Sequence, residues 1–225
     1  MKRVSANRFV CFFILAASGL SWDLYSKHEV FEDLGYPAHT SSWVREFFGG
    51  WLTFRLQTSF NEGALWGIGQ GYTWVFAALS VVAIVGVLYW LFVVGTARSL
   101  WLTISLALIM AGTLGNLFDR LGLHNCIDPV DGSQIHAVRD FLLFTFGGWP
   151  WPIFNFADVF LVTGAIMLVL HSFSSDRPAE SAASPKSPSE SKVDAETEPK
   201  TTTVRYSAFG FEDAARWFTR SSSSL

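Results

Sequence analysis

Two polar residues close to the start of an apolar stretch are the first candidates for chemistry in this sequence. Asn155 and Asp158 are three residues apart and share one face if, as the pattern predicts, a helix spans Ile153 to Phe173. That run is long enough to cross a bilayer, and Pro152 suits a first turn, where its missing N–H would be unpaired anyway. A carboxyl group inside a membrane costs about 2.5–3.5 kcal/mol, so Asp158 needs a polar partner.

A second carboxyl group could be the polar partner of Asp158, and the two groups together could catalyse a reaction. Two neighbouring carboxyl groups can hydrolyse a peptide bond when one is ionised and takes a proton from water while the other is protonated and polarises the carbonyl. The sequence contains neither His-Glu-x-x-His nor Gly-x-Ser-x-Gly, the patterns typical of zinc and serine hydrolases. We therefore expect carboxylate chemistry with no metal and no cofactor.

The composition is that of a membrane protein. Half of the 225 residues are hydrophobic and only 16% are charged, and the mean hydropathy is +0.31. The formal net charge of −3 is small, and the charges are not clustered, so nothing indicates a nucleic-acid partner. The two cysteines, Cys11 and Cys126, fit neither a disulfide framework nor a metal site.

Four apolar runs predict four membrane helices, at residues 9–25, 73–96, 100–118 and 153–173. The first run could instead be a cleaved signal peptide, because small residues from Ala16 to Gly19 offer a cleavage point. We favour a retained span, since the run continues to Asp23 and Lys27, which need a structural explanation.

The two longer connections are predicted to be polar loops, at residues 28–72 and 121–151. Within the first, Leu52, Phe54 and Leu56 alternate with polar residues, which indicates a strand with one apolar face. We expect this β structure to lie on the membrane surface.

An even number of spans places both termini on one side, and Lys2, Arg3 and Arg8 favour the cytoplasm for that side. Successive spans alternate in direction, so the ends of the first and third spans meet the start of the fourth at the outer face. The polar residues of these spans should therefore gather near one surface, which predicts a site that opens outward. They are Asp23, Asn116, Asp119, Asn155 and Asp158.

Each of these polar residues also has a purely structural interpretation. Asp23 and Lys27, at i and i+4, could be an interfacial ion pair that sets helix depth. Asp119 and Arg120 are expected to form a structural polar cluster, because an adjacent arginine keeps a carboxylate ionised. Asn116 is expected to support the site through hydrogen bonds, as is Asn155.

Five segments of the chain, in order, resemble the motifs of bacterial lipoprotein signal peptidase, the signal peptidase II family, over roughly residues 8–173. They are Asp23-Leu24-Tyr25-Ser26-Lys27, Asn61-Glu62-Gly63-Ala64, residues 112–120 from Gly112 to Arg120, Val138-Arg139-Asp140-Phe141 and Phe154-Asn155-Phe156-Ala157-Asp158. The resemblance implies an intramembrane aspartic endopeptidase of the bacterial inner membrane that cleaves diacylglyceryl-modified prolipoproteins before the modified cysteine. It also implies contact with membrane lipids and inhibition by globomycin-type peptides.

By the same resemblance, Asp140 and Asp158 are the catalytic pair. The positions implied to support the site or contact substrate are Asp23, Lys27, Asn61, Gly63, Gly115, Asn116, Asp119, Arg120, Asn155 and Ala157. Residues 122–136 are an insertion relative to the family's short connection, and this departure could alter access or bind a partner. The alternative from another class is a carboxylate-dependent transporter or receptor for a lipidated ligand.

The expected fold is an all-α membrane domain at residues 1–175, with four helices and a small extracytoplasmic β element. Residues 176–225 are expected to form a mostly disordered cytoplasmic tail, because they are rich in Ser, Pro, Glu and Lys.

Truncation after Asp176 should therefore preserve both membrane insertion and activity, because residues 174–203 hold too few large apolar residues to offset an ordering cost of about 1–2 kcal/mol per residue. The measurement compares full-length and truncated protein at equal membrane concentration. Normal insertion with a small fraction of the full-length rate would contradict a cytoplasmic tail or the four-span topology.

Overall fold

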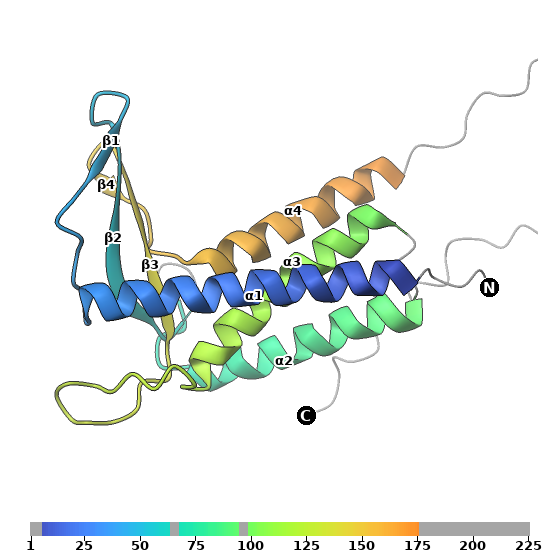
Figure 1. The fold of residues 1–225 in the computed structure, drawn as a ribbon, viewed down its shortest axis with the longest axis horizontal. Helices are drawn as coiled ribbons and strands as arrows, with labels where there is room; N and C mark the ends of the chain where they lie inside the picture. The colour runs from blue at the N-terminus through green and yellow to red at the C-terminus, as the bar shows by residue number, and fades with distance from the viewer. Residues whose placement is uncertain (1–5, 64–67, 95–98, 176–225) are drawn as a thin grey trace, which may run out of the picture. The chain divides into compact units, whose positions relative to one another are not determined.

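The computed structural model describes residues 6–63, 68–94 and 99–175, and these contain four helices apolar enough to cross a membrane. They are α1 (Ala6–Leu34), α2 (Thr73–Tyr89, continued by the π-helical segment η2, Trp90–Val94), α3 (Leu100–Arg120) and α4 (Phe156–Ser175). The four spans expected from the apolar runs are thus present (Figure 1). The expected tail at 176–225 lies outside the described residues.

The first helix is longer than its apolar run suggested. α1 continues to Leu34, so the beginning of the expected 28–72 loop is helical, and that boundary was wrong. Phe31 explains the extension, because its side chain is 4% exposed and packs in a cluster with Phe141 and Leu142. The last turns of α1 therefore extend past the other helices and are stabilised by packing against the sheet.

The fourth helix begins later than predicted. Phe154 pairs with Leu142 of a neighbouring strand: the Leu142 N–H donates to the Phe154 carbonyl at 2.8 Å and the Phe154 N–H to the Leu142 carbonyl at 3.2 Å. This ladder keeps the chain extended, so the expected first turn at Pro152 and Ile153 was wrong. α4 starts only at Phe156.

One antiparallel sheet lies beyond the end of the bundle, with the strand order β1-β2-β3-β4 (Figure 1). Its strands are β1 (Arg45–Phe47), β2 (Leu52–Asn61), β3 (Val138–Phe146) and β4 (Trp149–Pro150). β2 confirms the strand expected at Leu52–Leu56 and extends it. β3 and β4 correct the expected second loop at 121–151. β3 gave no alternating signal because its first six residues are all buried.

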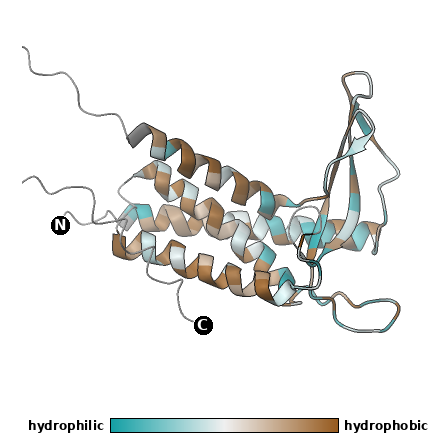
Figure 2. Ribbon diagram, turned by 180° about the vertical axis from the view of Figure 1, so that it is seen from behind, coloured by the Kyte–Doolittle hydropathy of each residue, from teal (hydrophilic) through white to brown (hydrophobic). Residues whose placement is uncertain are grey.

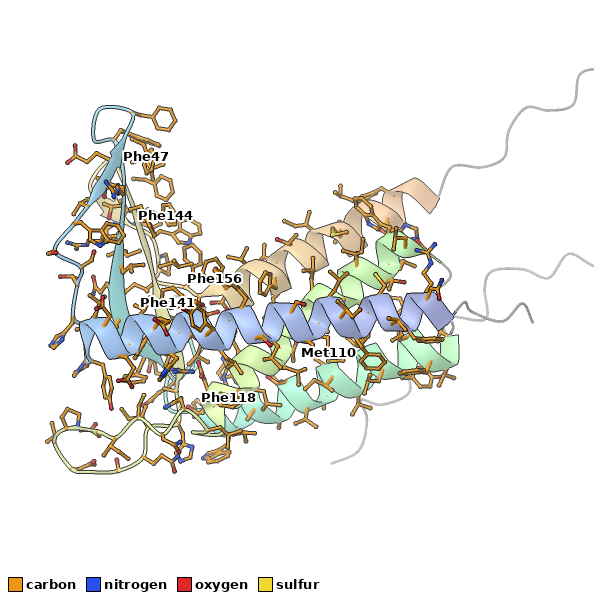
Figure 3. The ribbon with its side chains drawn as sticks, viewed as in Figure 1. Phe47, Met110, Phe118, Phe141, Phe144 and Phe156 are labelled. Carbon is orange, nitrogen blue, oxygen red and sulfur yellow. The ribbon has the colours of Figure 1, made fainter. Side chains whose placement is uncertain are left out.

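The two faces of the sheet differ in chemistry. Phe54 pairs with Phe144 across β2 and β3, and their rings lie 4.8 Å apart. Side chains at alternate positions of a strand share a face, and Phe47 and Phe144 point to the side on which the helices lie (Figure 3). Thr53, Arg55 and Gln57 occupy the alternate positions, which confirms the predicted division into an apolar and a polar face.

α3 is the central helix of the bundle, since it packs against α1, α2 and α4. Small residues permit the close approach: a Cβ at Gly112 would collide with the carbonyl oxygen of Ala157, and one at Gly19 would meet Ala111 at 2.9 Å. The outward surfaces are apolar, as on Val82 of α2 and Val162 of α4 (Figure 2).

Gly112→Ala should lower the stability of the bundle by about 1–3 kcal/mol, because its methyl group would force α3 and α4 apart. Gly86→Ala is the matched control, since a Cβ there meets nothing within 4 Å, and loss of a helix glycine should raise stability by about 0.5–1 kcal/mol. Thermal unfolding of both variants in detergent provides the measurement. Equal shifts would show that close packing at Gly112 is unimportant.

Candidate active site

A network of buried polar side chains lies where the helical bundle meets the sheet. It draws on the C-terminal half of α1, the end of α3, strand β3 and the start of α4, all at the same end of the bundle (Figures 1 and 3). Several of its members are completely inaccessible to solvent, which is rare for charged groups unless they are paired. The fully buried members are Asp23, Lys27, Asp119 and Asn155.

Asn155 and Asp158 form a reciprocal cap at the start of α4. The Asp158 N–H donates to Asn155 Oδ1 at 3.0 Å, and the Asn155 N–H donates to Asp158 Oδ2 at 3.2 Å. This is the geometry of a capping box, in which two side chains satisfy the unpaired N–H groups of a first turn. Asn155 therefore precedes the helix, and the spacing of three residues reflects a cap rather than one face within a span.

Asp140, on β3, shares a hydrogen-bonding partner with Asp158. Asn155 Nδ2 donates to Asp140 Oδ1 at 2.6 Å, while Asn61 Nδ2 donates to Asp140 Oδ2 at 3.1 Å. Asp140 is 2% exposed, whereas Asp158 is half-buried. Burial raises the pKa of Asp140 well above its usual range, and the nearby negative charge of Asp158 raises it further.

Lys27 lies beneath this pair and joins three side chains. Its Nζ is 2.8 Å from Asp23 Oδ2 and 3.1 Å from Asp119 Oδ2, and it donates to Asn116 Oδ1 at 3.1 Å. Asn116 Nδ2 in turn donates to Asp158 Oδ1 at 2.8 Å. The expected i,i+4 pair of Asp23 and Lys27 is present, but it is buried within the network rather than exposed at an interface.

Backbone and small residues complete the contact between α1, α3 and α4. The Ala157 N–H donates to Asp23 Oδ1 at 2.8 Å. A Cβ at Gly115 would collide with Asp23 Oδ2 and would lie 3.3 Å from the Ala157 Cβ. Gly115 and Ala157 are therefore small because a carboxylate and a helix occupy the adjoining space.

Asp119 belongs to a structural ion cluster, but its arginine is not the one expected. Arg139 Nε and Nη2 donate to Asp119 Oδ1 at 3.1 and 2.9 Å, and the Arg139 N–H donates to Asp119 Oδ2 at 3.0 Å. Arg120 instead donates to the Gly63 carbonyl at 3.2 Å, while the Gly63 N–H donates to Asn61 Oδ1 at 3.0 Å. Arg139 was missed as a site residue, although a charged residue in an otherwise apolar strand indicates a buried partner.

The residues inferred from the sequence as catalytic or supporting thus lie in one connected region. Asn155 donates to both candidate catalytic carboxylates, to Asp140 from its side chain and to Asp158 from its backbone N–H. The fully buried Lys27 is linked to Asp158 through Asn116. Over the described ranges, no group of three or more His, Cys, Asp or Glu side chains could hold a metal ion. Such an arrangement brings two carboxyl groups of different burial to one end of the bundle.

Comparison with known proteins agrees with this arrangement. The family model described as Signal peptidase (SPase) II matches residues 15–174. A lipoprotein signal peptidase of Rhodopirellula baltica is 44% identical over 170 residues, covering 75% of this chain and 74% of that protein. A lipoprotein signal peptidase of Bacillus pumilus is 37% identical over 117 residues, covering 52% of this chain and 67% of that protein.

A solved structure described as a bacterial membrane enzyme, determined by the in meso method at 2.3 Å resolution, has the same fold, with a TM-score of 0.59. It is 22% identical in sequence and covers 76% of this chain and 94% of its own. The family match spans most of the four-helix unit, including every element that contributes to the polar network. The chain therefore belongs to the signal peptidase II family.

Proposed function

We propose that this chain is an aspartic endopeptidase that removes signal peptides from prolipoproteins, cleaving before the diacylglyceryl-modified cysteine. The observation that carries the proposal is the pairing of Asp140 and Asp158 through Asn155, which contacts both carboxyl groups at the end of an apolar bundle. The relatives named lipoprotein signal peptidase supply the substrate class.

The different surroundings of the two carboxyl groups assign their roles. Asp140 is almost fully buried and retains a proton, so it donates a hydrogen bond to the scissile carbonyl oxygen. Asp158 is half-buried and acts as the base, removing a proton from a water molecule whose oxygen attacks the carbonyl carbon. Collapse of the tetrahedral intermediate breaks the C–N bond, and the proton held by Asp158 passes to the leaving amine.

The supporting residues hold this pair in position. Asn116 and Asn155 orient the two carboxyl groups, and Asn61 donates to Asp140. The site lies at the sheet end of the bundle, which we assign to the extracytoplasmic face of the bacterial inner membrane, with both termini cytoplasmic. The aromatic face of the sheet then rests on lipid, and globomycin-type peptides occupy the substrate's place.

The direct test is cleavage of a synthetic diacylglyceryl-cysteine propeptide by detergent-purified protein, since a transporter or receptor would bind the peptide without hydrolysis. Asp140→Asn and Asp158→Asn should each lower turnover about a thousandfold or more, because an amide cannot share the proton and the pair acts as a unit. Both variants should remain folded and inserted.

Asp33→Asn is the matched control, because Asp33 lies on α1 but is exposed, and it should leave turnover unchanged. Near-normal turnover in Asp140→Asn would move the catalytic pair elsewhere, most directly to Asp119 or Asp23.

The turnover number should fall as the pH rises through the raised pKa of Asp140, because deprotonation there removes the group that polarises the carbonyl. In the profile of turnover number against pH, this alkaline limb should lie above the usual carboxyl range of about pH 4. Asn61→Ala removes a hydrogen bond that favours ionised Asp140 and should shift the limb to higher pH. A limb that stays in place or moves to lower pH in Asn61→Ala would contradict the assignment of the proton to Asp140.

A further inference from the structure

A cavity lies apart from the carboxyl pair, between the end of β2, the start of α2 and the loop that follows α3. Its volume is about 350 Å³. The loop after α3 projects at the same end of the bundle as the sheet, close to where α2 begins (Figure 1). The side chains that give the cavity its character are Phe60, Glu62, Trp74, Asp128 and His136.

The loop wall of this cavity is held in place by hydrogen bonds. Ile127 bridges to Gln134, the Asp128 N–H donates to the Ser133 carbonyl at 2.8 Å, and Gln134 Nε2 donates to the Gly122 carbonyl at 2.6 Å. These residues belong to the 122–136 insertion, which the five family motifs leave unexplained. The insertion thus builds one side of a defined cavity.

The cavity is negatively charged. Asp128 Oδ1 accepts the Val130 N–H at 2.7 Å, and Glu62 Oε2 accepts the Gly71 N–H at 3.1 Å, so each carboxylate uses one oxygen to hold its own loop. Neither the sequence from 62 to 74 nor that from 121 to 137 contains a lysine or arginine. Arg120 immediately precedes the second segment, but it donates to the Gly63 carbonyl and does not line the cavity.

Aromatic rings and an imidazole complete the lining. The Trp74 and His136 rings lie 5.2 Å apart, and Phe60 lines the same space. The His136 side chain also lines the cavity, while its Nδ1 atom is buried and lies toward Gly122. Carboxylates combined with aromatic faces favour an organic cation, because the faces of aromatic rings attract positive charge.

One residue of the cavity lining is adjacent in sequence to a hydrogen-bonding partner of the candidate catalytic pair. Asn61 donates to Asp140, and the next residue, Glu62, lines the cavity. An extended chain advances about 3.3–3.6 Å per residue, so a peptide cleaved at the pair reaches the cavity within a few residues. Under the proposed function, we place the apolar signal segment of the substrate along the apolar spans and the polar mature segment toward the loop that follows α3.

We propose that this cavity binds an organic ammonium or guanidinium group, presented by a basic side chain in the first residues of the mature lipoprotein after the modified cysteine. The inference rests on the proposed function, which it deepens by assigning a substrate preference to the insertion. The ethanolamine headgroup of a phospholipid carries the same ammonium chemistry and is the other source of such a ligand.

The test uses the full chain in detergent without added lipid and two diacylglyceryl-cysteine propeptides that differ only in Lys or Gln at the third mature position. The Lys peptide should show about fivefold higher kcat/KM, as expected for an ion pair at a solvent-accessible site. Asp128→Asn should bring the ratio close to one, because Asn keeps the bond to the Val130 N–H but removes the charge. Cleavage of the Gln peptide should be unchanged.

Asp131→Asn is the matched control, since Asp131 lies in the same loop with the same charge but is exposed and does not line the cavity. It should keep the preference for Lys. Equal cleavage of both peptides by the parent protein, or equal loss of preference in the two variants, would overturn the proposal. Failure to cleave either peptide would instead overturn the proposed function, and this inference with it.

An additional experiment with added lipid distinguishes the two sources of the cation, the substrate and the phospholipid headgroup. Phosphatidylethanolamine or phosphatidylglycerol is added to the Gln peptide assay and to thermal unfolding of the protein. If the substrate is the source, the two lipids should act alike in the parent and in Asp128→Asn. Activation or stabilisation by phosphatidylethanolamine alone, lost in Asp128→Asn, would assign the cavity to the headgroup and overturn the substrate assignment.

Discussion

The buried ammonium group of Lys27 is the interaction on which the rest of the site depends. Its side chain is fully inaccessible, and an unpaired charge in that position would cost several kcal/mol. Asp23 and Asp119 neutralise it, and each of these carboxylates also holds a further element: Asp23 accepts the Ala157 N–H of α4, and Asp119 binds Arg139 of β3. The two elements that carry the candidate catalytic carboxyl groups, β3 and α4, are therefore positioned around one cation.

The lysine ammonium group can donate hydrogen bonds but cannot accept them, and this property sets the direction of the hydrogen bonds made by Asn116. Because Lys27 donates to Asn116 Oδ1, the Nδ2 group of Asn116 is left to donate to Asp158. Asn155 Nδ2 likewise points to Asn116 Oδ1 and Asp140 Oδ1, so both carboxyl groups meet donors. These donors stabilise a negative charge on the pair, while burial of Asp140 opposes a second one. At Asp140 the effect of burial is the larger one, and the pKa of its carboxyl group is raised.

The sequence predicted the features that depend on local periodicity and failed where distant segments pair. Apolar runs located the four spans, and i,i+4 spacing identified the pair of Asp23 and Lys27. The start of α4 depends on the ladder between Phe154 and Leu142, and the partner of Asp119 depends on the position of β3. The expected partner, Arg120, is adjacent in sequence, but it lies at the end of α3 and reaches Gly63 instead. The family motifs placed Asp140 near Asp158 because they encode tertiary contacts that periodicity does not.

In this protein, the close packing of the helices and the electrostatics of the site depend on the same residues. The glycine at 115 allows α3 to approach α4, and the space that a side chain would fill there is taken by the Asp23 carboxylate. A larger residue would have to displace that carboxylate from Lys27, leaving the ammonium with one counterion fewer and freeing the Ala157 N–H. The consequences would reach Asp158 through Asn116, which accepts from Lys27 and donates to Asp158. Small residues at the crossing of α1, α3 and α4 are therefore determinants of the charge balance of the carboxyl pair as well as of the fold.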